Sequence, residues 1–226
     1  VDQLALNGQY TIWGRVAEGM DVVTAISETP VDPDGRTTER VTLHSVAIRD
    51  IPPPEPLPFS TETAEALAAY GVVIETDLGP ITVELYPDRA PNHVRNFLRL
   101  TAAGVYDGMS FHRVVRGFVI QTGYMPSRRD PLTERQQRLV QTLEPEFNDT
   151  RHVRGTLSMA RGEDPASAST SFFICTDVAT ELDDQYTAFG EVVDGLDVVS
   201  LIESVETDGE RPINRVEVTT VRIIRR

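Results

Sequence analysis

The sequence contains no lysine, one cysteine and no long apolar run. All 21 basic residues are therefore arginine, which we attribute to a coding bias rather than to function, and they face 35 acidic residues for a formal net charge of -14. A chain this acidic repels polyanions, which excludes nucleic acid and anionic membrane surfaces as partners. No segment approaches the roughly 18 apolar residues of a membrane span, so we expect no membrane insertion.

The scarcity of cysteine and histidine also excludes several kinds of site. Cys175 is the only cysteine, so no disulfide forms within the chain, and its position in the apolar run "SFFIC" predicts a buried, inert thiol. The four histidines, His44, His93, His112 and His152, show no metal-ligand spacing. Glycine-rich phosphate loops and nucleophile elbows are absent too, and we expect neither a metal nor a cofactor.

One segment of this sequence is repeated. The stretch "QYTIWGRVAEGMDVVTAI" begins at Gln9 and "QYTAFGEVVDGLDVVSLI" begins at Gln185, and ten of the twenty positions from Gln9 to Glu28 are identical at this offset. The likeness continues from Arg40 ("RVTLHSVAIRD") and Arg215 ("RVEVTTVRIIRR"). Each copy predicts a strand, a turn, a short helix, a loop and a further strand. The pattern indicates duplication of the tail of a domain.

A Pro-rich stretch, "DIPPPEPLPF", separates the copies and predicts an extended linker. We therefore divide the chain into a partial domain (1–50), a linker (51–70) and a complete domain (71–226). Because the sequence begins at Val1 and not at a methionine, we expect that a leader or a longer upstream part has been removed. The compartment stays open: a bacterial cytoplasmic or periplasmic protein fits, with the tether favouring an extracytoplasmic one, and so does a cut fragment.

The third region predicts a mainly β fold. Its alternating apolar residues predict eight short strands, at "VVIET", "ITVEL", "SFHRVV", "GFVIQTG", "GTLSMAR", "SFFICT", "YTAFGEV" and "RVEVTTVRI". Amphipathic helices are predicted over 90–104 and 195–205, with a surface helix over 133–143 and a shorter one near 61–70. Since two main helices are too few to cover a sheet on both faces, we expect a closed eight-stranded antiparallel β-barrel capped by two helices, plus the N-terminal partial repeat.

The stretch "MSFHRVVRGFVIQTG" contains the most unusual residue, Arg113, inside a strand made of Phe111, Val114 and Val115. Charged side chains are almost never buried without a partner, so Arg113 either extends its head to water or a salt bridge, or has a function. With "FHRV", "GFVIQ", "LSMA", "SFFIC" and "LDDQYTAFG" in this order, the region from Val72 to Arg226 resembles the cyclophilin family of peptidyl-prolyl cis-trans isomerases.

The resemblance implies a substrate groove on the outside of an eight-stranded barrel. Carried over position by position, it implies catalytic Arg113, Phe118 and Gln121, and substrate-binding Val119, Ala160, Phe173, Leu182 and Tyr186. Phe111 and Phe172 are expected in the core instead. The implied function is acceleration of rotation about X-Pro peptide bonds, assisting protein folding as an isomerase or chaperone, with proline-containing peptides and unfolded proteins as partners.

Several positions depart from the usual family pattern. Val119 replaces Met, Arg161 replaces Asn, Ser171 replaces Gln, Glu181 replaces Trp and Tyr186 replaces His. "Leu-Asp-x-x-Tyr" is typical of bacterial members. The resemblance implies that tight binding of the immunosuppressant cyclosporin depends on the Trp at this position. Glu181 therefore predicts weak cyclosporin binding.

Two alternatives to an active isomerase remain open. Ser171 and Arg161 are compatible with a module or chaperone that binds proline peptides in the same groove with weak or no turnover. A small-ligand barrel needs an open interior, whereas the bulky alternation of the strands predicts a filled one.

The first copy lacks most of the implied site. Leu6 and Tyr10 match Leu182 and Tyr186, but Arg113 and Phe118 have no counterpart in residues 1–50. Two strands that normally complete a larger barrel are too few for a stable domain. We expect this segment to be inactive alone, and to be loosely packed or to borrow a surface.

Overall fold

The structure is a computed structural model that describes residues 10–11, 14, 16–48 and 58–226. The chain divides into two compact units, Val1–Pro54 and Glu55–Arg226, and each is described by itself. Among the described residues, no helix is both long and apolar enough to cross a membrane.

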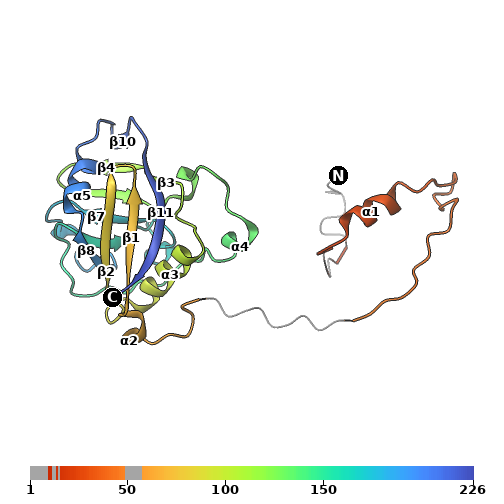
Figure 1. The fold of residues 1–226 in the computed structure, drawn as a ribbon, viewed down its shortest axis with the longest axis horizontal. Helices are drawn as coiled ribbons and strands as arrows, with labels where there is room; N and C mark the ends of the chain where they lie inside the picture. Colours follow the sequence, from red (N-terminus) through yellow and green to blue (C-terminus); the bar gives the residue numbers. More distant parts are fainter. Residues whose placement is uncertain (1–9, 12–13, 15, 49–57) are drawn as a thin grey trace. The chain divides into compact units, whose positions relative to one another are not determined.

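The second unit contains the sheet and nearly all of the regular structure (Figure 1). Its strands are β1 (Tyr70–Thr76), β2 (Gly79–Leu85), β3 (Met109–Phe111), β4 (Arg113–Val115), β5 (Val119–Thr122), β6 (Thr156–Met159), β7 (Phe172–Cys175), β8 (Ala188–Asp194), β9 (Thr207–Asp208), β10 (Arg211–Pro212) and β11 (Val216–Arg225). Its helices are α2 (Ala64–Leu67), α3 (Pro91–Ala102), α4 (Glu134–Gln137) and α5 (Leu196–Glu203), with 3-10 turns η2 (Met125–Ser127), η3 (Pro165–Ser167) and η4 (Thr180–Leu182).

Nine strands form one antiparallel sheet in the order β3-β11-β1-β2-β8-β6-β7-β5-β4. The two ends of this order, β3 and β4, are consecutive in the chain and separated only by His112, whose backbone N–H donates to the carbonyl of Gln121 at 3.1 Å. The sheet is therefore a nearly closed barrel. The predicted count of eight differs by one because the strand predicted over 110–115 bends at His112 and is divided there.

The interior of the barrel is filled by side chains from alternate strand positions. Phe172 and Ile174 of β7 and Ile120 of β5 are at most 1% exposed and belong to the inner cluster. Within the same cluster, the Phe97 ring lies 5.2–5.3 Å from the rings of Tyr106, Phe172 and Phe189. Phe111 and Phe172 are core residues, as predicted, and the filled interior argues against a small-ligand barrel.

Two helices cover the barrel, as predicted. Pro91 begins α3 at a position where its missing N–H costs nothing, and Gly104 follows the helix with φ +66°. The predicted apolar face of α3 is fully buried: Val94, Phe97, Leu98 and Thr101 are 0–4% exposed.

The second helix, α5, buries Val198, Val199 and Ile202 and packs against β2, β4 and β5. Its approach to β2 depends on Gly79, because a Cβ there would lie 2.9 Å from the Val198 side chain.

The surface helix predicted over 133–143 is much shorter. Thr133 begins α4 with a capping box, but the helix ends at Gln137. Leu139 is then drawn into the core at 4% exposure, and Leu143 donates its N–H to the carbonyl of Ala168 at 2.9 Å. Burial of Leu139, partial burial of Leu143 and this backbone bond stabilise a turned path over a longer exposed helix.

Part of the predicted linker (51–70) belongs to the second unit. Its α2 begins at the N-cap Thr63 and buries Leu67 completely. Phe59 packs edge-on against Tyr70 at 5.2 Å, and Arg95 of α3 donates to the carbonyl of Glu62 at 2.6 Å. The composition of the linker did not indicate these contacts: the bond from Arg95 comes from beyond the linker's end, and the Phe59–Tyr70 pair joins its two sides across α2.

The described part of the first unit has one helix, α1 (Met20–Ser27), which buries no residue. A turn follows, in which the Asp32 carboxylate accepts the N–H groups of Asp34 and Arg36 and a bridge pairs Val31 with Thr37. The strand predicted from Arg40 is not formed over 40–48, where Leu43, Val46 and Ile48 are 78–98% exposed, since no neighbouring strand pairs with it. The predicted match at Leu6 lies outside the described residues, as does part of the strand predicted from Tyr10.

The exposure of α1 predicts weak protection from hydrogen exchange. An eight-residue helix without buried side chains is marginal in water. We expect the amides of Met20–Ser27 to exchange at nearly the rate of an unfolded peptide, while those of β5 and β7 require global unfolding. Exchange followed by NMR or mass spectrometry checks this, and equal protection of α1 and β7 would contradict it.

Candidate active site

A second apolar cluster lies on the outer face of the barrel. It consists of Val119, Phe173, Cys175, Ala179 and Leu182, with Val115, Phe118, Ala160 and Tyr186 packed at its edge. Its strand members alternate with core residues, since neighbouring side chains of a strand point to opposite faces. The outer cluster is therefore a consequence of the same pleat that fills the interior.

A pocket of about 200 Å³ opens on this cluster. Its lining residues are Arg113, Phe118, Val119, Gln121, Ala160, Arg161, Phe173, Leu182 and Tyr186. The structure thus brings together all eight residues that the resemblance singled out, and it adds Arg161.

The strand register sets the floor of the pocket. Arg113 of β4 pairs with Gln121 of β5, which pairs with Phe173 of β7, which in turn pairs with Ser158 of β6. Directly opposite residues project from the same face of a sheet. One row across four strands therefore places a cation, an amide and an aromatic ring in sequence.

The guanidinium of Arg113 is held by two side chains. Its Nε donates to Glu210 Oε2 at 2.6 Å and its Nη2 to Glu210 Oε1 at 3.2 Å, while Nη1 is 3.4 Å from Gln121 Oε1. The Arg113 side chain is 34% exposed. Arg113 therefore forms a salt bridge with Glu210, one of the two explanations that the sequence offered for a charged residue in this strand. It also borders the pocket, which is compatible with the other explanation, a function. The hydrogen bond from Arg113 lowers the pKa of the Glu210 carboxyl.

The opposite wall of the pocket is an aromatic and cationic stack. The Tyr186 ring meets Phe173 edge-on at 5.7 Å, and the Arg161 guanidinium lies 4.6 Å above the Tyr186 ring. The N–H groups of Arg161 donate to the carbonyls of Gly162, Glu163 and Gln185. Arg161 is thus fixed as part of the wall.

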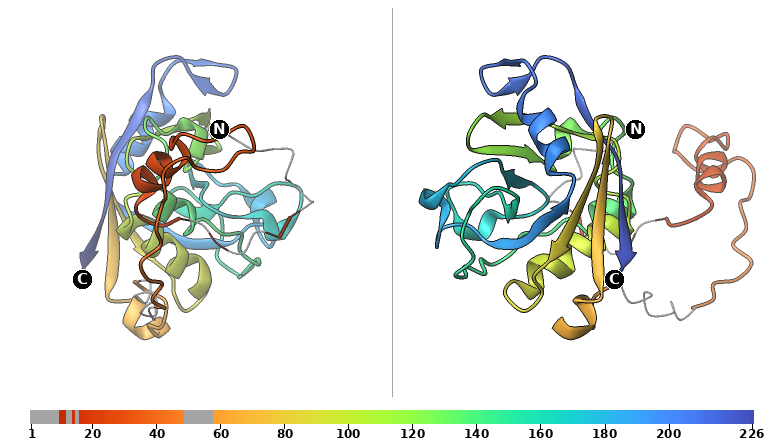
Figure 2. Two further views of the ribbon diagram at one scale, coloured as in Figure 1. Left: turned by 90° about the vertical axis from the view of Figure 1, so that its right-hand side faces the viewer. Right: turned by 60° about the vertical axis from the view of Figure 1, so that its left-hand side comes forward.

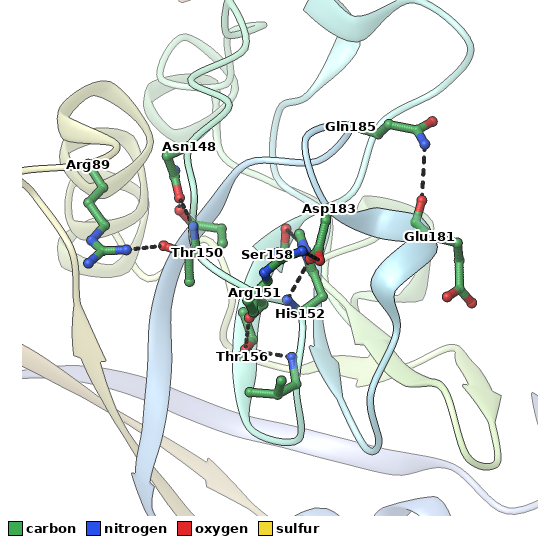
Figure 3. Close-up of polar contacts among 12 residues, drawn as sticks. Arg89, Asn148, Thr150, Arg151, His152, Thr156, Ser158, Glu181, Asp183 and Gln185 are labelled. Carbon is green, nitrogen blue, oxygen red and sulfur yellow. Dashed lines mark hydrogen bonds and ion pairs between the residues drawn. The ribbon is translucent and has the colours of Figure 1, made fainter.

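A polar network links Arg151, His152, Ser158 and Asp183 next to this wall, and Figure 3 shows its contacts. The Asp183 carboxylate accepts Arg151 Nη1 at 2.7 Å and the backbone N–H of His152 at 2.8 Å, and it lies 3.0 Å from His152 Nδ1. His152 Nε2 lies 3.0 Å from Ser158 Oγ, and the His152 ring stacks on Phe173 at 6.1 Å. Asp183 follows Leu182 directly, and His152 contacts Phe173. The network therefore joins these two pocket residues, Leu182 and Phe173, to Ser158 of β6.

The order Asp183, His152, Ser158 has the hydrogen-bond pattern of a hydrolase triad. A carboxylate only accepts, so Nδ1 is the donor, and in the neutral ring Nε2 accepts from the hydroxyl. Ser158 is 0% exposed and His152 is 1% exposed. Since no substrate reaches a hydroxyl buried in this way, the network is structural support rather than a nucleophile.

Cys175 lies in the outer cluster and is fully buried. Burial raises the pKa of its thiol to about 12, with the charges of Asp183 and Glu181 adding to the effect. The thiol therefore stays protonated at neutral pH, as the sequence predicted for an inert cysteine.

Comparison with known proteins identifies the family of this arrangement. The model of the family described as cyclophilin type peptidyl-prolyl cis-trans isomerase/CLD matches residues 1–48 and 71–223. The chain belongs to the cyclophilin family. The nearly closed barrel is therefore a cyclophilin fold.

Two curated relatives and one solved structure illustrate the likeness. Peptidyl-prolyl cis-trans isomerase CYP71 of Arabidopsis thaliana is 42% identical over 158 residues, which cover 67% of this chain and 24% of the relative. CYP23 of the same plant is 40% identical over 146 residues, 64% of this chain and 65% of the relative. This cyclophilin thus spans a quarter to two thirds of these relatives. A cyclophilin of Cryptosporidium parvum, solved in the presence of the dipeptide Ala-Pro, superposes with a TM-score of 0.61 at 27% identity, covering 69% of this chain and 99% of that one.

A larger groove, of about 940 Å³, lies beside β3 and the β9–β10 hairpin of the cyclophilin unit. Tyr124 and Ile213 line it together with Asp208 and Arg215. Arg215 donates to the carbonyls of Gly108 and Ser127 at 2.6 and 2.8 Å, and His112 also lines the groove. The eight residues that the resemblance implies line the smaller pocket instead.

One side chain at the pocket, Glu210, was missed from the sequence. Arg161 directly follows "LSMA" and departs from the family pattern there, but the resemblance did not include it among the implied site residues. Glu210 lies 97 residues from Arg113 in a charged turn, where nothing local distinguishes it from its acidic neighbours.

The Asp183 network predicts an acid-sensitive contribution to stability. The hydrogen bond from Arg151 and the backbone N–H of His152 lower the pKa of Asp183 to about 2. Because the folded value lies below that of an unfolded aspartate, about 3.9, this stabilisation is complete above pH 4 and is lost as the pH falls toward 2. Asp183→Asn should lower the free energy of unfolding by about 2–4 kcal/mol at pH 7, measured by urea titration.

The matched control is Asp184→Asn, which removes the same charge from an exposed neighbour at φ +59°, a conformation that asparagine tolerates. We expect a change within about 0.5 kcal/mol. Equal losses in the two variants would show that the Asp183 contacts contribute nothing specific.

Proposed function

We propose that the second unit is a peptidyl-prolyl cis-trans isomerase and that the Arg113 pocket is its site. One observation carries the proposal: a fixed guanidinium, that of Arg113, borders an apolar pocket formed by Phe118, Val119, Phe173 and Leu182. Membership of the cyclophilin family and the names of the curated relatives support the same reaction.

The reaction needs no cofactor and no proton transfer. Resonance gives the X-Pro C–N bond double-bond character, and rotation about a peptide bond faces a barrier of roughly 18–20 kcal/mol. In the twisted transition state this resonance is lost, the proline nitrogen becomes pyramidal, and its lone pair can accept a hydrogen bond. A site that favours the twisted amide over the planar one accelerates exchange in both directions.

The chain supplies two groups suited to the twisted amide. The guanidinium of Arg113 is always charged and planar. Glu210 accepts only some of the Arg113 N–H groups, so others are free to donate to the proline nitrogen. The apolar pocket favours the less polar, twisted amide. Gln121, whose Oε1 lies 3.4 Å from Arg113 Nη1, is placed to hold the neighbouring backbone of the peptide.

Typical interaction energies indicate how much of the rate acceleration each group supplies. A hydrogen bond from a charged donor contributes on the order of 1.5–3 kcal/mol. Each 1.36 kcal/mol is about tenfold in rate. Arg113 therefore accounts for roughly ten- to a hundredfold, and the pocket supplies the remainder.

The proposed substrates are proline-containing peptides and unfolded proteins, in keeping with a role in assisting protein folding. The superposed Cryptosporidium parvum structure was determined in the presence of Ala-Pro, which supports a proline dipeptide as the minimal ligand here. Val119, Ala160, Phe173, Leu182 and Tyr186 are the proposed substrate-binding residues, and "Leu-Asp-x-x-Tyr" at 182–186 leads us to group the unit with bacterial members.

For residues 1–50 we propose the C-terminal third of a further cyclophilin-like domain. The family model matches 1–48, and α1 repeats α5 down to its N-cap, since Gly19 and Gly195 have φ of 81° and 89° without a side-chain cap. This segment contains no counterpart of Arg113 or Phe118 and is proposed to be inactive by itself.

Arg113→Ala should lower kcat/KM for an X-Pro tetrapeptide by about ten- to a hundredfold and leave the fold intact, because Arg113 is partly exposed and fills no core space. Exchange spectroscopy of the peptide by NMR and circular dichroism of the protein check both parts. The control is Arg222→Ala on β11, which breaks an arginine–carboxylate contact with Glu75 away from the pocket and should retain parental turnover. If Arg113→Ala matches the parent, the mechanism is wrong. If neither the parent protein nor Arg113→Ala accelerates isomerisation but both bind the peptide, the unit is a binding module.

Glu181 underlies a prediction about inhibition. It precedes Leu182 at the rim of the pocket, and we expect weak binding of cyclosporin because an acidic side chain there offers no aromatic surface. Glu181→Trp should strengthen binding by about tenfold or more, as buried tryptophan anchors do at interfaces. Titration calorimetry of the two proteins measures the difference, and an unchanged affinity would contradict the role given to this position.

A further inference from the structure

The turn of the β9–β10 hairpin brings a carboxylate to the proposed catalytic arginine. Glu210 lies between β9 and β10, after Gly209 at φ +59°, and it reaches Arg113 across 97 residues of sequence. Figure 2 shows this blue hairpin at one end of the barrel.

The hairpin is fixed to the strand that carries Arg113. The backbone N–H of Val114 donates to the Glu210 carbonyl at 2.7 Å, and Ile213 N–H donates to the Glu206 carbonyl at 2.9 Å. The Glu210 carboxylate therefore starts from a backbone held against β4. A side chain anchored in this way can orient its partner without first ordering a free loop.

The geometry of the pair determines which N–H groups remain available. Glu210 accepts both Nε–H, at 2.6 Å, and one N–H of Nη2, at 3.2 Å, along one edge of the guanidinium. Nη1 is left on the side of Gln121, which lines the pocket. Because a guanidinium is planar, fixing one edge fixes the direction of its other donors.

The same pair counters the freedom of a long side chain. Arg113 is 34% exposed and Glu210 is 56% exposed, so neither is held by burial. An arginine in this position has many rotamers, and only a few direct Nη1 toward the pocket. The two hydrogen bonds select among them.

We propose that Glu210 is a positioning residue that orients the Arg113 guanidinium toward the pocket. This proposal rests on the proposed isomerase function, which it deepens by naming what holds the catalytic donor. Glu210 acts through Arg113 and does not itself touch the rotating amide.

The experiment compares Glu210→Gln and Glu210→Ala with Asp208→Asn in the full chain. Asp208 lies in the same hairpin, is exposed, and makes no described side-chain contact with Arg113, so its variant removes an equal charge without removing the orientation. Two readouts are needed: kcat and KM separately for an X-Pro tetrapeptide, and the NMR resonance of the Arg113 Nε–Hε group.

Glu210→Ala should lower kcat by about three- to tenfold with KM within about twofold of the parent, since apolar binding of the ground state is untouched. Glu210→Gln keeps one acceptor and should fall between alanine and the parent. The Arg113 Hε resonance should shift and exchange faster with water in both Glu210 variants, and Asp208→Asn should match the parent in both readouts.

An unchanged or raised kcat in Glu210→Ala, with a normal parent, would overturn the proposal while leaving the isomerase function intact. An unchanged Hε resonance in that variant would overturn it as well, because Arg113 would then be oriented without Glu210. If the parent has no turnover, the proposed function fails on its own, and the Hε resonance still decides whether Glu210 holds Arg113.

Discussion

The pocket of this protein depends on the register of three neighbouring strands. Arg113, Gln121 and Phe173 lie opposite one another on β4, β5 and β7, and all three project from the outer face. A slip of one residue would turn them inward and bring core residues such as Ile120 to the surface. The apolar side chains inside the barrel therefore fix the site outside it. This coupling explains how a barrel whose interior is filled by side chains can carry a functional surface.

Carboxylates from distant loops complete what the register begins. Asp183 ties the segment of Leu182 to His152 and thereby to β6, and Glu210 holds the guanidinium of Arg113 from the β9–β10 hairpin. Acidic side chains are numerous in this chain, whose formal net charge is -14. These two differ because their oxygens accept directed hydrogen bonds at the edge of the pocket. One supports the apolar wall and the other the cation, so the two sides of the pocket are held independently.

The repeated helix shows how far local sequence determines structure. Both α1 and α5 form over the same residues of the repeat and follow a glycine with positive φ. Val198, Val199 and Ile202 of α5 are 0–6% exposed, whereas the corresponding residues of α1 are 43–57% exposed. Local propensity and capping produce the helix in both places. Packing needs the strands of a barrel beneath it, and among the described residues those strands lie in the second unit.

The sequence by itself determined the mainly β fold, the two capping helices and, through family motifs, the eight residues that line one pocket, because alternation and motif order are local properties of the chain. It could not determine the break at His112, the short α4 or the attachment of α2, which follow from competition between local hydrogen bonds and burial against distant residues. Nor could it find Glu210, since nothing near residue 210 indicates Arg113. Only the tertiary structure decided these features, because each depends on contacts between segments that closure of the barrel brings together.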